Sequence, residues 1–311
     1  MKKYEEVQFV LKGNIDHLIS LEGVHAVGIG YSTEKEHTDE LSIHVYIESE
    51  KAANNLLQSG KIFKEIGSIP VSVIIMPPIS CDILYVDKDT ILPDDKQYRP
   101  LRGGTQLYLE DHKQAWLGTL GIFVKSQNAL DDNLYILSNL HVLDALDRAV
   151  YQPDKRAKDS FVATTSIARS FPDTDAALAK INDRKNIEIN CIQDIGVVDG
   201  IQSVTINDLH KKVIKRGRTT LLTEGTIDAI SASVIVNMGE GVIRTFTDCV
   251  IVKPNEGGQF SAPGDSGSCV VLKENKKLIG LHFAGSTQRS IFCKIDNVFT
   301  NFDVDLPENN H

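Results

Sequence analysis

The sequence contains no uninterrupted run of about 20 apolar residues, the length that a membrane-spanning helix needs. Its first residues, MKKYEEVQFVLKGNIDHL, place acidic residues after two lysines and lack the apolar core of a secretory signal. We therefore expect a cytoplasmic protein with no membrane partner.

An excess of basic residues is also absent. Lys and Arg total 33 against 42 Asp and Glu, which gives a formal net charge of −9. Nucleic acids and anionic membranes attract basic surfaces, so neither is expected as a partner. The acidic excess is more simply a feature that favours solubility.

Cysteine is scarce and forms no Cys-x-x-Cys pair. The odd total of 5 argues against a complete disulfide framework. Cys269 and Cys293 lie in apolar strand patterns, which favours buried thiols that pack as small apolar side chains. A disulfide between Cys249 and another strand cysteine stays open at this point.

No metal or nucleotide motif is complete. His25, His37 and His44 are close in sequence but alternate with strand residues and lack metal-ligand spacing. Gly28 and Gly30 belong to neither a Gly-x-Gly-x-x-Gly nor a Walker pattern. We expect no metal site and no cofactor.

The most informative stretch runs from Phe260 to Gly285. Within it, Gly264-Asp265-Ser266-Gly267-Ser268 precedes an apolar strand, a charged turn and a second apolar strand. Glycine tolerates backbone angles that can aim several N–H groups at one point, so the Ser266 hydroxyl could be presented to a substrate. The alternative is a plain hairpin with a turn rich in Gly and Ser.

A histidine and a carboxylate that could activate this serine lie upstream. His141 ends the apolar run LYILSNLHVL, and Asp175 stands at the start of the apolar segment Ala176–Ile181. A nucleophilic serine needs a base, and the base needs a group that orients it. Asp173 is the rival carboxylate, because residues two apart on a strand share a face. We prefer Asp175 because it directly adjoins the apolar run; a structural histidine and an ordinary turn carboxylate are the alternative.

These motifs carry a family resemblance. LSNLHVL, DTDAALAKI and APGDSGSCVV resemble the histidine, aspartate and serine motifs of trypsin-like (chymotrypsin-fold) serine peptidases, particularly bacterial intracellular-type members. The order His141, Asp175, Ser266 is that of chymotrypsin. The resemblance covers residues 100 to 305 and implies two antiparallel six-stranded β-barrels with the site between them.

The resemblance also implies roles. Ser266 would attack a peptide carbonyl with help from His141 and Asp175, and the N–H groups of Gly264 and Ser266 would form the oxyanion hole. Three residues fall on the family's substrate-binding strand: His282, Phe283 and Gly285. His282 matches the histidine that glutamyl endopeptidases use, which implies a preference for an acidic residue before the scissile bond. A packed strand residue is the alternative for His282.

The resemblance leaves open which group pairs with Asp265. Arg99-Pro100-Leu101-Arg102-Gly103-Gly104 is faintly similar to the activation junction of trypsin-like zymogens. In cleaved members the aspartate equivalent to Asp265 pairs with the liberated amino terminus. Either this chain is cut near Arg102 or Asp265 has another partner, because a buried carboxylate without one is costly.

The sequence before the motifs predicts a small α/β domain. Its periodicity indicates a helix over 5–21, strands over 24–31 and 41–47, a helix over 51–58 and a strand over 71–76. We thus expect a domain over 1–80 that recruits or restrains, a linker over 81–98, a peptidase domain over 99–305 and an acidic tail over 306–311.

The sequence as a whole predicts a mainly β protein. Three functions stay open: an active serine endopeptidase acting on a protein or peptide, a peptidase-fold binding module with an unformed cleft, and a self-processing protein that cuts near Arg102.

Overall fold

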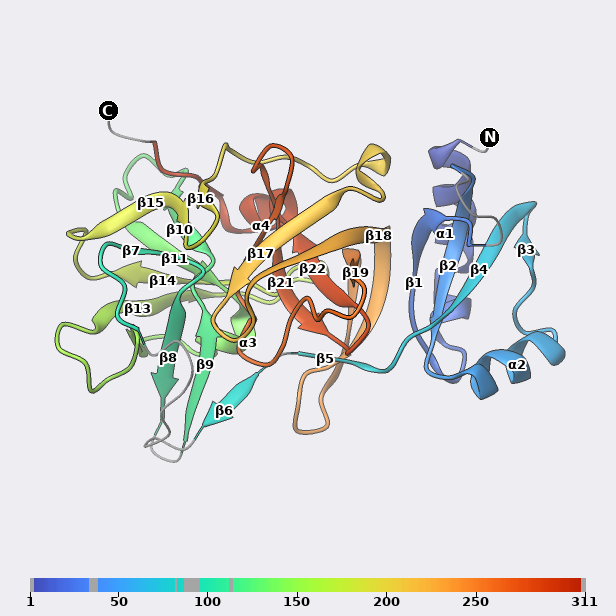
Figure 1. Ribbon diagram of the computed structural model, residues 1–311, viewed down its shortest axis with the longest axis horizontal. Coiled ribbons are helices and arrows are strands. Elements are labelled where there is room, and N and C mark those ends of the chain that lie inside the picture. The colour runs from blue at the N-terminus through green and yellow to red at the C-terminus, as the bar shows by residue number, and fades with distance from the viewer. Residues whose placement is uncertain (1–2, 34–38, 82, 87–95, 112–113, 309–311) are drawn as a thin grey trace.

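The computed structural model describes residues 3–33, 39–81, 83–86, 96–111 and 114–308 (Figure 1). This part of the chain is mainly β-structure, as the sequence predicts. Its α-helices are α1 (Tyr4–Ile19), α2 (Glu50–Gln58), α3 (Leu140–Leu143) and α4 (Ile295–Phe302). Among the described residues, no helix is long and apolar enough to cross a membrane.

The first barrel closes through one bent strand. β9 pairs with β8 and β10 pairs with β11, and only Leu120 and Gly121 separate β9 from β10. With β9 and β10 counted as one strand, six antiparallel strands complete the barrel. They are β8 (Gln106–Glu110), β9 (Ala115–Thr119) with β10 (Ile122–Ser126), β11 (Leu134–Ser138), β12 (Ala149–Tyr151), β13 (Phe161–Ala168) and β14 (Ala177–Ile181).

The second barrel closes because β17 pairs with both β18 and β20. The order β17-β20-β21-β22-β19-β18 is antiparallel throughout, so this barrel has six strands. The strands are β17 (Lys212–Gly217), β18 (Leu221–Asn237), β19 (Ile243–Pro254), β20 (Cys269–Leu272), β21 (Leu278–Gly285) and β22 (Ser290–Lys294). The predicted pair of six-stranded barrels is confirmed.

The two barrels share a packed interface. One apolar cluster contains Ile122 and Leu137 from the first barrel together with Val271 and Leu281 from the second. A small sheet of β7 (Leu101–Gly103), β15 (Ile187–Ile192) and β16 (Gly196–Val197) lies beside β10. The 3-10 helix η1 (Ile206–Asp208) lies on the connection between the barrels, and β23 (Val304–Asp305) follows α4 and pairs with β10.

The N-terminal α/β region is joined to the second barrel by a continuous sheet. It contains α1, β1 (Val24–Tyr31), β2 (Leu41–Ile47), α2, β3 (Glu65–Ile66) and β4 (Ile69–Ile75). β1 pairs antiparallel with β18, so the N-terminal strands extend the second barrel into an 11-stranded sheet. The Tyr46 hydroxyl and Arg289 Nε also donate to Asp228 Oδ2, at 2.9 and 2.8 Å, which fixes β2 against the barrel.

Two short strands follow the N-terminal region. β5 (Ile79–Cys81) pairs with β18 and β21 of the second barrel, and β6 (Leu84–Val86) pairs with β9 of the first. Figure 1 shows this stretch in cyan, running from β4 past β18 toward β9. Much of the predicted linker, namely residues 82 and 87–95, lies outside the described residues. Of the part that is described, Cys81 and Leu84–Val86 are strand, whereas residues 83 and 96–98 have no regular secondary structure.

Candidate active site

His141 and Asp175 meet where two neighbouring strands of the first barrel have their ends. β11 leads into α3, which carries His141, and Asp175 lies just before β14, the partner of β11. His141 Nδ1 forms a short hydrogen bond with Asp175 Oδ2. The backbone N–H of Leu140 donates to the other carboxylate oxygen at 3.1 Å, and Asn139 Nδ2 donates to the Asp175 carbonyl at 2.6 Å. The imidazole is therefore held in one orientation by a buried carboxylate.

The rival carboxylate, Asp173, lies elsewhere. Its Oδ1 accepts hydrogen bonds from Asn301 Nδ2 at 3.0 Å and from Thr174 Oγ1 at 3.2 Å. These contacts tie Asp173 to α4 and not to His141. The geometry thus favours Asp175 over Asp173.

The loop that carries Ser266 packs directly on the first barrel. Gly267 has a φ of +94°, and a Cβ added to it would lie 2.2 Å from both Ser138 Oγ and the Thr119 carbonyl oxygen. The Thr119 N–H donates to the Ser266 carbonyl at 2.8 Å. Only glycine fits at position 267. The loop of the second barrel therefore sits against the strand that leads to His141.

The Ser266 hydroxyl is not bonded to His141 in this structure. Its Oγ donates to the Phe283 carbonyl at 3.3 Å, and the residue is fully buried. His141 Nε2 is buried and has no hydrogen-bond partner among the described residues. His141 therefore contacts Asp175 but not the Ser266 hydroxyl, whose proton it would accept. Catalytic hydrogen bonds are often unformed in the absence of substrate.

The two predicted oxyanion-hole donors stand on either side of Asp265. Gly264 has a φ of +97°, and a Cβ there would lie 2.6 Å from Thr219 Oγ1. Its carbonyl accepts from Thr119 Oγ1 at 2.9 Å. No described residue accepts a hydrogen bond from the N–H of Gly264 or of Ser266. Both N–H groups thus remain available to another acceptor.

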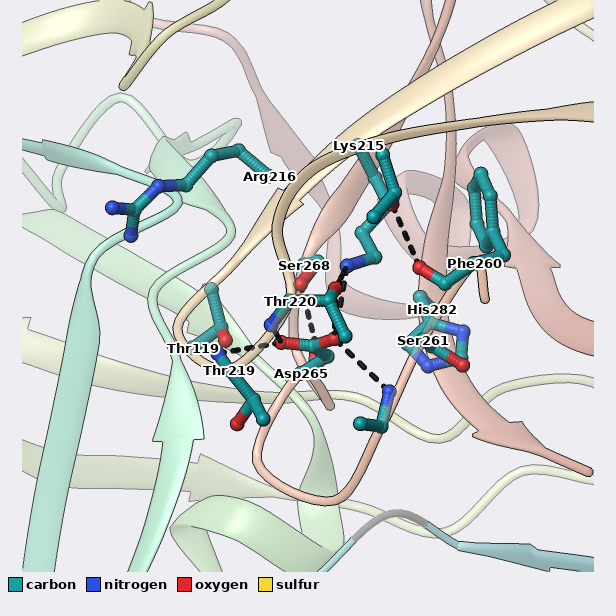
Figure 2. A network of polar contacts seen from close by, with 12 residues as sticks. Thr119, Lys215, Arg216, Thr219, Thr220, Phe260, Ser261, Asp265, Ser268 and His282 are labelled. Atoms are coloured by element: carbon teal, nitrogen blue, oxygen red, sulfur yellow. Dashed lines mark hydrogen bonds and ion pairs between the residues drawn. The ribbon is translucent and has the colours of Figure 1, made fainter. Parts of the chain in front are cut away.

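Asp265 has a partner that the sequence leaves open. Lys215 Nζ lies 2.9 Å from Asp265 Oδ2, and both side chains are fully buried (Figure 2). Thr220 Oγ1 donates to the same oxygen at 2.6 Å, and the Thr219 N–H donates to Oδ1 at 2.8 Å. Burial alone would raise the pKa of Asp265, but the Lys215 charge and these hydrogen bonds hold that pKa below its usual value. An internal lysine supplies the cation that a liberated amino terminus supplies in cleaved peptidases.

The predicted junction is itself part of the fold. Arg102 lies on β7, which pairs with β15, and its guanidinium forms an ion pair with Glu188 at 3.0 Å. Asp265 therefore has its partner in an uncut chain.

The predicted substrate-binding residues lie on β21. His282 is fully buried, and its Nδ1 donates to the Ile291 carbonyl at 3.0 Å. The hydroxyls of Ser261 and Ser290 lie 2.8 Å apart, and a Cβ on Gly285 would lie 3.1 Å from Ser261 Oγ. The Phe283 side chain packs into the core against Phe246, with ring centroids 4.8 Å apart, so its contribution near Ser266 is its carbonyl. The buried hydroxyls of Ser261 and Ser290 thus lie next to Gly285.

His141 opens onto a pocket of 320 Å³ between β9 and the β18–β19 turn. Trp116, Ile83, Tyr85 and Met238 are among the residues that line it. A larger pocket of 590 Å³, lined by Arg99, Tyr151 and Lys185, contains none of the candidate site residues. The volume of a pocket alone therefore does not identify the candidate active site.

His44 and Cys269 lie buried outside the candidate site. His44 is buried between the Tyr46 hydroxyl and the Tyr31 carbonyl, at 3.2 and 2.8 Å, and His37 lies outside the described residues. No cluster of three or more potential metal ligands occurs in the described ranges. All five cysteines are free thiols, so no disulfide involves Cys249. Burial raises the pKa of Cys269, which keeps this thiol protonated and unreactive.

Comparison with known proteins gives one family match. The model of the Nal1 C-terminal domain matches residues 154–301, less than half of the chain. This range includes Asp175 and Ser266 but not His141. No curated protein matches the chain.

Solved structures similar to this chain include proteases. Thermobifida fusca protease A is 18% identical, with 66% of this chain and 97% of that chain covered and a TM-score of 0.49. A glutamic acid-specific serine protease, described as using a histidine triad in substrate binding, is also 18% identical, with coverages of 67% and 100% and a TM-score of 0.49. Cellulomonas bogoriensis chymotrypsin is 17% identical, with coverages of 66% and 97% and a TM-score of 0.47. Likenesses this weak carry no functional argument, so the case for a peptidase rests on the site geometry.

Proposed function

We propose that this protein is a serine endopeptidase in which Ser266 is the nucleophile, His141 the general base and Asp175 the group that orients the base. The hydrogen bond between His141 Nδ1 and the buried Asp175 is the observation that carries the proposal. It leaves the buried Nε2 as the nitrogen able to accept a proton.

The reaction would follow from these roles. Ser266 Oγ would first have to leave the Phe283 carbonyl in order to donate to His141 Nε2. Oγ would then attack the peptide carbonyl while Nε2 takes its proton, and the imidazolium, stabilised by Asp175, would return that proton to the leaving amine. The N–H groups of Gly264 and Ser266 would hold the oxyanion, each worth about 3 kcal/mol in the transition state. Water would then attack the acyl group while His141 Nε2 takes its proton, and the bond to Ser266 Oγ would break as the imidazolium returns that proton to Oγ, which releases the carboxylic acid.

We extend the proposal to specificity, with His282 and Gly285 as substrate-binding residues and the backbone of Phe283 beside them. His282, Ser261 and Ser290 are buried polar residues, and such residues would suit an acidic side chain before the scissile bond. A pocket that selects Lys or Arg would need an acid, and Asp265 is already paired with Lys215.

Two finer assignments also remain proposals. Five free thiols agree with a reducing compartment and therefore with a cytoplasmic location. The resemblance to bacterial intracellular-type peptidases rests on the sequence motifs alone.

A second candidate function is a peptidase-fold binding module. The bond from Ser266 Oγ to Phe283, together with full burial of Ser266, favours it. Self-processing near Arg102 is less favoured, because Arg102 is held in a sheet and by Glu188.

A fluorophosphonate probe distinguishes these candidates, since it labels only a serine that is activated by a base. The full chain is used, because removing residues 1–98 would strip β1 from β18. We expect one adduct, mapped to Ser266 by peptide mass, in the wild type and none in Ser266→Ala. If neither the wild type nor any variant with an opened cleft forms an adduct, the peptidase assignment is rejected and the binding module remains.

A further inference from the structure

A stretch of the chain crosses from one barrel to the other beside the candidate site. We call its described residues, 79–81 and 83–86, the crossing segment; residue 82 lies outside the described residues. On the second barrel, Ser80 pairs antiparallel with Gly285, and Cys81 with Ala284. The edge of β21 that follows His282 and Phe283 is therefore already occupied by a strand.

The other half of the crossing segment binds the first barrel. Leu84 stands opposite Leu117 in an antiparallel pairing of β6 with β9. β9 lies close to the base, since Trp116 and His141 line the same pocket. The segment is thus held by backbone pairing on both sides of the site.

Side chains of the crossing segment reach the catalytic groups. Ile83 lines the pocket into which His141 opens. A Cβ on Gly264 would lie 3.2 Å from Leu84 Cδ2, so Leu84 packs on the predicted oxyanion-hole residue. A scissile carbonyl would have to stand between His141 and the N–H of Gly264. Ile83 and Leu84 occupy the approach to that space.

We propose that the crossing segment fills the substrate cleft as an internal extended peptide, so that it and a peptide substrate exclude one another. This inference rests on the proposed function. It names the substrate class as an extended chain that adds a strand to β21 on one barrel and to β9 on the other. It also accounts for the burial of Ser266 and of His141 Nε2.

The segment can leave without opening either barrel. β5 and β6 have three residues each, and both six-stranded barrels close without them. Release costs the two short pairings and the apolar contacts of the segment, which include those of the buried Ile79 as well as those of Ile83 and Leu84. The observed rate at Ser266 is scaled by the fraction of molecules in which the segment is released.

The test compares full-length Leu84→Asp with a matched control, Phe63→Asp, which makes the same kind of change at a residue that is 61% exposed in the N-terminal region. A buried aspartate against Gly264 and Leu117 disfavours the docked segment. Amide hydrogen exchange over 79–86 reports whether the segment is released, and the rate of fluorophosphonate labelling at Ser266 reports access. Leu84→Ala is the milder variant if Leu84→Asp loses its fold by circular dichroism.

We expect faster exchange over 79–86 and labelling that is about tenfold faster or more in Leu84→Asp, an intermediate increase in Leu84→Ala, and wild-type behaviour in Phe63→Asp. Equal labelling of wild type and Leu84→Asp, with the segment shown to be released, would overturn mutual exclusion and leave the peptidase assignment intact. No labelling in any variant despite release would overturn the proposed function and this inference with it.

Discussion

Lys215 and Asp265 form a fully buried ion pair across 50 residues of sequence, with Nζ and Oδ2 2.9 Å apart. β17 carries the lysine, and the loop that ends in the candidate nucleophile carries the aspartate. The pair therefore ties the conformation of the Ser266 loop to the wall of the second barrel. In this chain the loop is ordered from within, without a new amino terminus.

The first prediction concerns stability. Lys215→Met leaves Asp265 as a buried charge without a cation, which costs about 3 to 5 kcal/mol in the free energy of unfolding. Urea denaturation measures it. Lys273→Met, which breaks the half-exposed pair with Glu224, is the matched control and should cost about 1 kcal/mol or less. Equal losses in the two variants would show that the buried pair does not order the loop.

The second prediction concerns pH. The folded-state pKa of Asp265 lies below the ordinary value of 3.8, so its ionisation stabilises the fold above that pH, and this contribution is lost as the pH falls through the folded-state pKa. Lys215→Met/Asp265→Asn has no such group. The stability difference between wild type and this double variant should change in the double variant's favour below about pH 4. A constant difference down to about pH 3, measured by urea denaturation, would contradict the assignment.

The resemblance predicts the two barrels, and the strand patterns predict several boundaries without error. Val24–Tyr31 and Leu41–Ile47 are found as predicted, because their apolar residues face a buried surface along the whole strand. The sequence of β13, FVATTSIA, mixes polar and apolar residues without clear alternation, so periodicity does not identify this strand. β5 and β6 are too short for periodicity to show, and pairing with distant strands stabilises them.

The sequence likewise predicts some features of the candidate site and not others. Local motifs suggest His141, Asp175 and Ser266 as candidates, and Asp175, not Asp173, is the carboxylate that contacts His141. The partner of Asp265 depends on a contact between distant strands, which no local pattern contains. The bond of Ser266 Oγ to the Phe283 carbonyl is a side-chain contact that the sequence does not specify.

The third prediction separates the two carboxylates. Asp175→Asn should lower kcat by about 10⁴-fold, because the amide can favour the wrong tautomer of His141. Asp173→Asn, which keeps a partner for Asn301, should leave kcat nearly unchanged. Both are assayed by peptide hydrolysis in the Leu84→Asp chain. An equal loss in Asp173→Asn would mean that the role of Asp175 is structural.

The fourth prediction concerns specificity. His282→Leu should lower kcat/KM for peptides with glutamate before the scissile bond by about 10- to 100-fold, because a hydrogen bond to a charged group is lost. Peptides with leucine at that place should be affected little. His25→Leu, on β1, serves as the control. A uniform loss for both peptides would identify His282 as a packing residue.

The fifth prediction concerns activation. Because Lys215 already pairs with Asp265, activity should not require a cut near Arg102. Intact mass should show an uncut chain in samples that label at Ser266, and Arg102→Gln should label at the wild-type rate. Labelling that appears only together with a fragment starting near residue 103 would restore the zymogen alternative.

Hydrolysis of a peptide bond by Ser266 tests the account most directly. The measurement follows a fluorogenic peptide with glutamate before the scissile bond, incubated with Leu84→Asp and with Leu84→Asp/Ser266→Ala. The account predicts steady cleavage by the first chain and none by the second. Equal cleavage by both chains, or none by either when the crossing segment is shown to be released, would contradict it.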